Sequence, residues 1–394
     1  MSRQDWEHAV DRELAGLREQ HLFRQRRVVT LLDATHVEVE GRQCVNFASN
    51  NYLGLTHHPR VIHAARHAAQ AFGAGSGAAP LITGYGPAHQ SAERRIAAWK
   101  GTENAVLLPS GYQANVATIQ ALAAIGERAG GGTRFLLDKL AHASLIDAIR
   151  STEAPHRIFP HNHLAKLDRL IAEADPRQLQ VVVTESIFSM DGDAADLAGL
   201  TELKARRPFV LLLDEAHASG VYGPGGAGLA AELKLAGLAD LTVVTLSKAL
   251  GSAGGAVCAS ERLCDAVVNF GRAYVYSTHL PPSAAAAAEA AIDVMADEPQ
   301  RQRRVRALAA RVRSELGAKS LALPPGDSPI IPITLGSERA ALEAARVLQD
   351  QGLWVLAIRP PTVPRGTSRL RVTLCSEHRD DEVTRLIAAL AAFR

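Results

Sequence analysis

Short apolar runs rich in valine, leucine and isoleucine recur through much of the chain. They fall at 104–109, 134–138, 180–186, 209–214 and 241–246, and stretches with helical periodicity separate them. Runs of this length between turn residues are typical of strands that are buried on both faces. Because these strands alternate with helices, the pattern predicts an α/β fold with a mostly parallel central sheet.

The pattern changes towards the C-terminus. Long helical patterns at 284–296 and 300–317 give way to short strands at 330–335, 354–358 and 369–374, with helices at 338–351 and 379–392. We therefore expect an N-terminal arm and hairpin over 1–46, a large domain over 47–292 and a smaller α+β domain over 293–394. In the arm we expect a helix over 5–27, with Trp6, Val10, Leu14 and Leu17 on one stripe, and a hairpin that turns at Gly41.

Composition excludes several classes of protein. The 394 residues carry 43 basic and 41 acidic side chains, which gives no argument for a nucleic acid or an acidic membrane surface as partner. No run of about 18 apolar residues is present, so we expect no membrane-spanning helix. Four cysteines without a CxxC pair (Cys44, Cys258, Cys264 and Cys375) are expected to be free thiols in a reducing cytoplasm. His161 and His163 lack neighbouring ligands for a metal and are expected at the surface.

One lysine follows a predicted strand at a chemically useful place. The run at 241–246 leads through Thr245 and Ser247 to Lys248, and a glycine-rich turn comes next. Scarce water at such a position favours the neutral amine, which is the form that makes a Schiff base. A lysine that only extends from a strand end towards solvent is the plainer interpretation.

The strand at 209–214 favours the Schiff-base interpretation of Lys248, because this strand ends in Asp214 and is followed by His217. Asp214 and Lys248 are 34 residues apart, which is about the length of one βαβ crossover. Both groups would then lie at the carboxyl edge of one parallel sheet, where open α/β sheets bind ligands. A buried carboxylate needs a cationic partner. A lysine for a Schiff base and an aspartate for a pyridinium nitrogen are what pyridoxal phosphate (PLP) chemistry uses.

Two further turns are candidate binding elements. The stretch 110–115, SGYQAN, joins a strand to a helix and predicts a phosphate site at the helix N-terminus. The glycine-rich stretch 73–86 lacks the G-x-G-x-x-G spacing and follows a helical pattern, so we expect a flexible loop and no dinucleotide site.

Three positively charged or aromatic positions remain open to two interpretations each. His142 either begins a helix or stacks on a flat cofactor. The basic residues Arg24, Arg26 and Arg27 either form a solvated helix end or lie over a site for an anionic acyl chain. Arg371 either faces solvent or captures a carboxylate.

Seven motifs together resemble the α-oxoamine synthases: TLSKALGSAGG, DEAH, SGYQAN, HASL, FSMDGD, SNNYLGL and RPPTVPRGTSRLR. These are PLP enzymes of fold type I, the aspartate aminotransferase fold. Within the family the chain is most similar to members of the biotin pathway. The resemblance implies a decarboxylative condensation of L-alanine with a pimeloyl thioester, either pimeloyl-CoA or a pimeloyl carrier protein, in a homodimer with shared active sites. Members that join glycine to acetyl-CoA, or another α-oxoamine synthase, are the alternative, and a PLP-binding regulator without turnover is the alternative of another class.

The resemblance also implies roles for matching residues. The catalytic residues would be Lys248 as the Schiff-base lysine and proton carrier, Asp214 at the pyridine nitrogen and His142 stacked on the ring. The remaining cofactor contacts would be His217, Ser189, Gly111, Tyr112, Thr245 and, from the neighbouring subunit, Thr278. The substrate contacts would be Arg24, Asn50, His142, Thr362 and Arg371. Asn51, Ala79–Pro80 and Ser247 depart from the family's common residues.

Overall fold

The computed structural model describes residues 3–235 and 237–393, which fall into two compact units. Unit 1 comprises Met1–Ser49, Met190–Gly192 and Ala307–Arg394, and unit 2 comprises Asn50–Ser189 and Asp193–Arg306. The N-terminal arm is therefore grouped with the C-terminal residues. The domain boundaries expected at 46 and 292 remain predictions.

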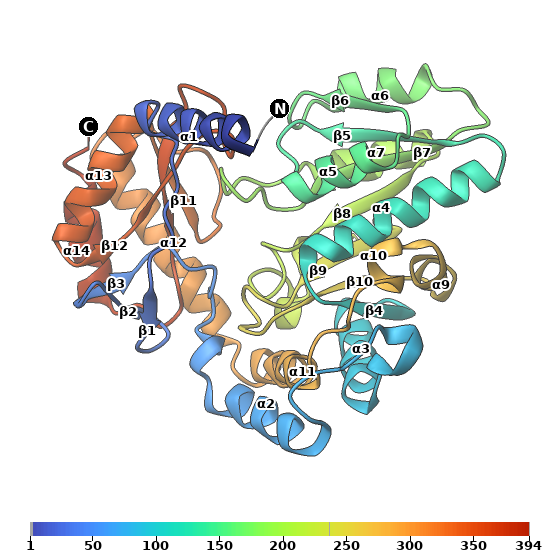
Figure 1. Cartoon of the computed structure of the whole chain (residues 1–394), viewed down its shortest axis with the longest axis horizontal. Coiled ribbons are helices and arrows are strands. Elements are labelled where there is room, and N and C mark those ends of the chain that lie inside the picture. Colours follow the sequence, from blue (N-terminus) through green and yellow to red (C-terminus); the bar gives the residue numbers. More distant parts are fainter. Residues whose placement is uncertain (1–2, 236, 394) are drawn as a thin grey trace. The chain divides into compact units, whose positions relative to one another are not determined.

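Unit 2 is built on a seven-stranded sheet in the order β4-β10-β9-β8-β7-β5-β6 (Figure 1). Its strands are β4 (Asn104–Leu108), β5 (Thr133–Asp138), β6 (His156–Phe159), β7 (Leu179–Glu185), β8 (Val210–Asp214), β9 (Leu241–Thr245) and β10 (Gly255–Ala259). Strand β10 runs antiparallel to β4 and β9, and the other neighbouring strands are parallel. The predicted α/β fold with a mostly parallel sheet is confirmed.

Helices pack against this sheet because its strands are apolar on both faces. The helices of unit 2 are α2 (Pro59–Phe72), α3 (Pro87–Lys100), α4 (Gly111–Arg128), α5 (Ala143–Ser151), α6 (Leu164–Ala172), α7 (Leu197–Arg206), α8 (Leu229–Glu232), α9 (Glu261–Phe270), α10 (Arg272–Val275) and α11 (Pro282–Asp297), with short helical turns at Leu55–His57, Pro80–Gly84 and Pro224–Gly226. Helix α4 contacts β4, β5, β9 and β10. Its buried face joins Leu137, Val183, Leu212 and Val243 from four strands in one apolar core.

Unit 1 holds two smaller sheets, β1-β2-β3-β12 and β11-β14-β13. Its strands are β1 (Val29–Leu31), β2 (His36–Val39), β3 (Arg42–Asn46), β11 (Ile330–Gly336), β12 (Leu353–Trp354), β13 (Leu356–Ile358) and β14 (Ser368–Thr373), and its helices are α1 (Arg3–Glu19), α13 (Glu338–Asp350) and α14 (Asp380–Leu390). Helix α12 (Gln300–Ala318) contains the division between the units. The expected hairpin is confirmed: β2 and β3 are antiparallel, and the two turn residues Glu40 and Gly41 have φ of 53° and 77°, as a tight hairpin turn requires.

The first helix is shorter than expected. The prediction of a helix over 5–27 is wrong beyond Glu19, where α1 ends. The apolar stripe of this helix stops at Leu17, and none of its residues is buried, so no packing extends it. The β-branched residues Val28, Val29 and Thr30 then favour an extended chain, and Val29 begins β1.

Two findings concern helices and cysteines in the described residues. None of the described helices combines the length and the apolar character that crossing a membrane would require. Cys44, Cys258, Cys264 and Cys375 are all buried free thiols.

Candidate active site

A chain of polar contacts leads away from the amine of Lys248, which lies just beyond the end of β9. Its Nζ is 2.8 Å from Nε2 of His217, in the loop after β8. The other ring nitrogen of His217, Nδ1, is 2.6 Å from the hydroxyl of Tyr52, and that hydroxyl donates to Oδ1 of Asn50 at 3.3 Å. His217 and Tyr52 are buried, so the two ring nitrogens are fixed in direction. The structure thus brings three predicted residues together through Tyr52, to which the sequence analysis gave no role.

A second polar chain surrounds Asp214, the last residue of β8. Its carboxylate is only 5% exposed. Oδ2 accepts a hydrogen bond from Nδ2 of Asn115 at 2.8 Å, and Oδ1 accepts one from the backbone N–H of Ala216 at 2.8 Å. Nδ2 of Asn115 also lies 2.9 Å from Oγ of Ser144, which is 2.8 Å from Nδ1 of His142. Asn115 and Ser144 therefore connect the predicted aspartate to the predicted histidine.

The sheet explains why Asp214 and Lys248 fall on one edge. Strands β8 and β9 are parallel neighbours, with Asp214 opposite Val243. Both strands end at the same edge of the sheet. His217 follows the end of β8, and Lys248 follows the end of β9. The expectation that the two strands share one parallel sheet is confirmed.

A buried glutamate lies under the same edge. Glu185 ends β7 and is the register partner of Asp214 on β8. Burial raises the pKa of Glu185 well above its ordinary value, and the charge of Asp214 raises it further, whereas Lys248 and the backbone N–H groups of His142 and Ser189 oppose the shift. Burial and the neighbouring Asp214 thus both favour the neutral form of Glu185. The sequence offered no signal for it beyond its place at the end of a strand.

The N-terminus of α4 forms a close-fitting corner. Oγ of Ser110 caps the helix by accepting the N–H of Gln113 at 3.1 Å, and the first turn presents N–H groups at the positive end of the helix dipole. A Cβ on Gly111 would lie 3.2 Å from the side chain of Thr245, so a larger residue would crowd this corner. Such a terminus is a suitable anion site.

The other predicted cofactor contacts lie near the ends of these elements. The hydroxyl of Tyr112 donates to Oδ2 of Asp147 at 2.9 Å, and Tyr112 is exposed. Ser189 is buried after β7, and Thr278 is exposed in the loop after α10.

Three predicted substrate residues belong to unit 1. Nη2 of Arg24 donates to the carbonyl of Pro360 at 3.1 Å, and the N–H of Thr362 donates to the carbonyl of Arg359 at 3.1 Å. Arg371 lies on β14 and is buried, so the interpretation that it faces solvent is wrong. The remaining two, Asn50 and His142, belong to unit 2.

The structure corrects the expectation for His161, whose side chain is only 24% exposed. Its Nδ1 is 3.0 Å from Asp138, at the end of β5, and its Nε2 is 2.7 Å from Asp193. Although burial alone would lower the pKa of His161, these two carboxylates raise it to about 10. The resulting imidazolium joins the loop after β5 to the loop that follows Ser189. Its partners are distant in sequence, which is why the sequence analysis missed them.

Comparison with known proteins identifies the family. The model of the family "Aminotransferase class I and II" matches residues 42–390. The 8-amino-7-oxononanoate synthase of Anaeromyxobacter dehalogenans is 45% identical over 98% of this chain and 95% of its own length. That of Maricaulis maris is 43% identical over 96% and 94%.

The chain belongs to the 8-amino-7-oxononanoate synthase family.

Solved structures support membership of this synthase family at the level of the fold. A Sphingomonas wittichii serine palmitoyltransferase superposes with a TM-score of 0.90 at 28% identity, covering 98% of this chain and 96% of that one. An SPT structure with PLP gives 0.91 at 28% identity, covering 100% and 98%. The Francisella tularensis 8-amino-7-oxononanoate synthase gives 0.76 at 25% identity, covering 89% and 97%. The predicted resemblance and the predicted fold type are confirmed, and the role of each site residue in this synthase family member remains a prediction.

Proposed function

We propose that this chain condenses L-alanine with a pimeloyl thioester and releases 8-amino-7-oxononanoate, carbon dioxide and the free thiol carrier. The observation that carries the proposal is 39–45% identity to synthases of that name over at least 96% of the chain. The reaction belongs to biotin biosynthesis and depends on PLP.

The donor set of unit 2 fits PLP. The buried Asp214 carboxylate accepts hydrogen bonds from an amide and a backbone N–H, both neutral, so a cationic pyridine nitrogen would supply the missing charge. The Lys248 amine is held beside His217 and would bind the cofactor covalently. The N-terminus of α4 at Gly111, with Tyr112 and Thr245, would hold the phosphate, and His217 and Ser189 would bond the phenolic oxygen.

When bound, PLP supplies an electron sink for a carbanion next to the amino group. We infer that Lys248 takes the α-proton of alanine on Nζ and later returns a proton to the same carbon. A positioned acid or base of this kind contributes about 100- to 10,000-fold. His217, held by Tyr52, orients the amine for this transfer. The α-carbon of alanine bonds to the thioester carbonyl, the thiol leaves, and the alanine carboxylate departs as carbon dioxide.

The remaining side chains would position the substrates. Arg371 would hold the alanine carboxylate, because a guanidinium binds a carboxylate through two parallel hydrogen bonds. Asn50 and His142 would contact the amino acid, and Arg24 and Thr362 would lie along the acyl chain.

We also infer a homodimer and a cytoplasmic location. In the homodimer the exposed Thr278 would serve the neighbouring subunit's site. Four free thiols support a reducing compartment.

The experiment supplies purified holoenzyme with alanine, glycine or serine, each paired with pimeloyl-, acetyl- or palmitoyl-CoA. We expect product and carbon dioxide mainly from alanine with pimeloyl-CoA, and loss of turnover with retained folding in Lys248→Ala. Serine with palmitoyl-CoA is included because the superposition with serine palmitoyltransferase is close. Preference for another pair, or wild-type turnover in Lys248→Ala, would overturn the proposal.

A further inference from the structure

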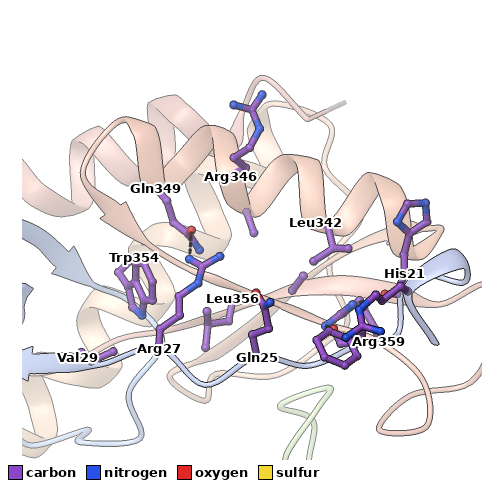
Figure 2. A pocket seen from close by; sticks show the side chains of 14 residues that line it. His21, Gln25, Arg27, Val29, Leu342, Arg346, Gln349, Trp354, Leu356 and Arg359 are labelled. Atoms are coloured by element: carbon purple, nitrogen blue, oxygen red, sulfur yellow. Dashed lines mark hydrogen bonds between the residues drawn. The ribbon is translucent and has the colours of Figure 1, made fainter. Parts of the chain in front are cut away.

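A cavity of about 600 Å³ in unit 1 is lined partly by arginines (Figure 2). One of them is Arg359, whose carbonyl accepts the N–H of Thr362. The cavity therefore adjoins a residue that is already expected to lie along the acyl chain, and it belongs to the substrate side of the proposed function. A different cluster of charged side chains, in unit 2, has no role in that function: Asp138, His161 and Asp193.

His161 connects two segments that carry predicted cofactor contacts. Its Nδ1 is 3.0 Å from Oδ1 of Asp138, the last residue of β5, and its Nε2 is 2.7 Å from Oδ2 of Asp193. Burial alone would lower the pKa of His161, but the two carboxylates raise it to about 10. The ring is therefore an imidazolium at neutral pH and donates from both nitrogens. Hydrogen bonds between ionised groups are stronger than those between neutral ones, so this one side chain ties the two carboxylates together.

On one side, the bridge ends at the turn that leads to His142. Asp138 is only 1% exposed, and its Oδ1 also accepts the N–H of Leu140 at 2.9 Å. Its backbone carbonyl accepts the N–H of Ala141 at 3.1 Å. Asp138 thus shapes the turn directly before His142, the residue that is expected to stack on the cofactor.

On the other side, the bridge ends on the loop that carries Ser189. The N–H of Phe188 donates to the carbonyl of Asp193 at 2.9 Å, so Asp193 lies across the loop from the residue before Ser189. The ring of His161 also packs edge-on against Phe188, with the ring centroids 4.3 Å apart. Within the described residues, Oδ1 of Asp193 is buried and accepts no hydrogen bond. The orientation of this carboxylate therefore depends on His161.

The two segments meet at a common buried group. The backbone N–H groups of His142 and Ser189 both bond the carboxyl of Glu185. Asn162, the neighbour of His161, adds a further tie to the loop, because its Nδ2 donates to the carbonyl of Ala194 at 2.9 Å. The position of Ser189 relative to His142 therefore depends on contacts made by the turn after β6.

We propose that His161 is a positioning residue for the cofactor, which holds the loop of Ser189 so that the serine hydroxyl meets the phenolic oxygen of PLP. The inference rests on the roles proposed for Ser189 and His142. A donor to the phenolic oxygen stabilises its negative charge, so the cofactor bound to Lys248 loses its proton at a lower pH. A misplaced donor should raise that pH. Asp138 and Asp193 are the charged groups that face His161, and they keep it protonated over this range.

The first test follows the visible absorbance of the PLP-bound protein as the pH is raised. His161→Gln removes the cation. His163→Asn is its matched control, because His163 is exposed and caps α6 by accepting the N–H of Lys166, a role that Asn also fills. We expect Ser189→Ala to raise the midpoint by about one pH unit and His161→Gln to raise it by about half a unit or more, whereas His163→Asn should keep the wild-type midpoint.

A double variant separates positioning from a general loss of stability. In His161→Gln/Ser189→Ala the midpoint should equal that of Ser189→Ala, because the hydroxyl that His161 positions is already absent. Equal and additive shifts would overturn the inference. A lower stability of His161→Gln with an unchanged midpoint would also overturn it, since the bridge would then be purely structural.

Hydrogen exchange of the apoprotein gives a readout without the cofactor. Exchange over residues 186–195 should be about tenfold or more faster in His161→Gln than in wild type or His163→Asn. Asp193→Asn breaks the same bridge from its other end and should reproduce both effects, which keeps the inference testable if His161→Gln does not fold. Unchanged exchange in both folded variants would refute the inference.

The outcomes distinguish this inference from the proposed function. If Ser189→Ala leaves the midpoint unchanged, the role proposed for Ser189 fails, and the inference fails with it. Neither measurement uses a substrate, so absence of product from alanine and pimeloyl-CoA would refute the proposed reaction alone.

Discussion

The contact between Asn115 and Asp214 offers a quantitative test of how the chain holds its cofactor. Asn115 is 2% exposed and its Nδ2 donates to Oδ2 of Asp214 at 2.8 Å. Asn115→Leu keeps a side chain of similar size but removes this donor. A hydrogen bond to a charged group is worth about 1.5–3 kcal/mol, and 1.4 kcal/mol is a factor of ten. If Asp214 pairs with the pyridine nitrogen of the cofactor as proposed, the affinity of Asn115→Leu for PLP should be about 10- to 150-fold lower than that of wild type.

The assay is a titration of the apoprotein with PLP, followed by visible absorbance, with circular dichroism as a check on folding. Asn269→Leu is the control, because Asn269 is exposed on α9 and its side chain only bonds the backbone of its own helix. Ser144→Ala separates the two contacts of Asn115, since it removes the 2.9 Å partner and leaves Asp214 bonded. We expect Ser144→Ala to weaken PLP binding less than Asn115→Leu does. Wild-type affinity in a folded Asn115→Leu protein would refute the reasoning.

Three further changes test other contacts. Tyr52→Phe removes the hydroxyl that holds His217, and should lower kcat/KM about tenfold, the effect of about 1.5 kcal/mol, with little change in thermal stability; unchanged kinetics would contradict the orienting role. Lys100→Met leaves the buried Glu215 carboxylate without the ammonium that lies 2.5 Å away, and should lower the free energy of unfolding in urea by about 3–5 kcal/mol. A loss below about 1 kcal/mol, the size typical of an exposed ion pair, would show that water reaches the pair. The pKa of His161 is raised from 6.5 to about 10. The stabilisation that its imidazolium provides is therefore complete below about pH 6.5 and disappears as the pH rises towards 10. His161→Gln should abolish this part of the pH dependence of the free energy of unfolding, and an unchanged pH profile would exclude this contribution of His161.

Sequence reasoning identified the elements whose signals are local. The runs ending at Asp214 and Thr245 are strands because a strand buried on both faces must be apolar throughout. The 34-residue spacing of Asp214 and Lys248 is about the length of one βαβ unit, so it predicts that both lie at one edge if the two strands are parallel neighbours. The helix end of the arm was misplaced because a polar, basic continuation is compatible with both helix and extended chain.

The supporting contacts were decided by the tertiary structure alone. Tyr52 and His217 are 165 residues apart, and Asn115 and Asp214 are 99 apart. Neither pair has a periodicity or a spacing that predicts it, because a hydrogen bond between side chains depends on how separate strands and helices pack. The sequence therefore predicts which groups carry the chemistry and the edge of the sheet on which they emerge. Only the folded chain decides what holds those groups in position, since burial beside a particular partner is a property of the packed core.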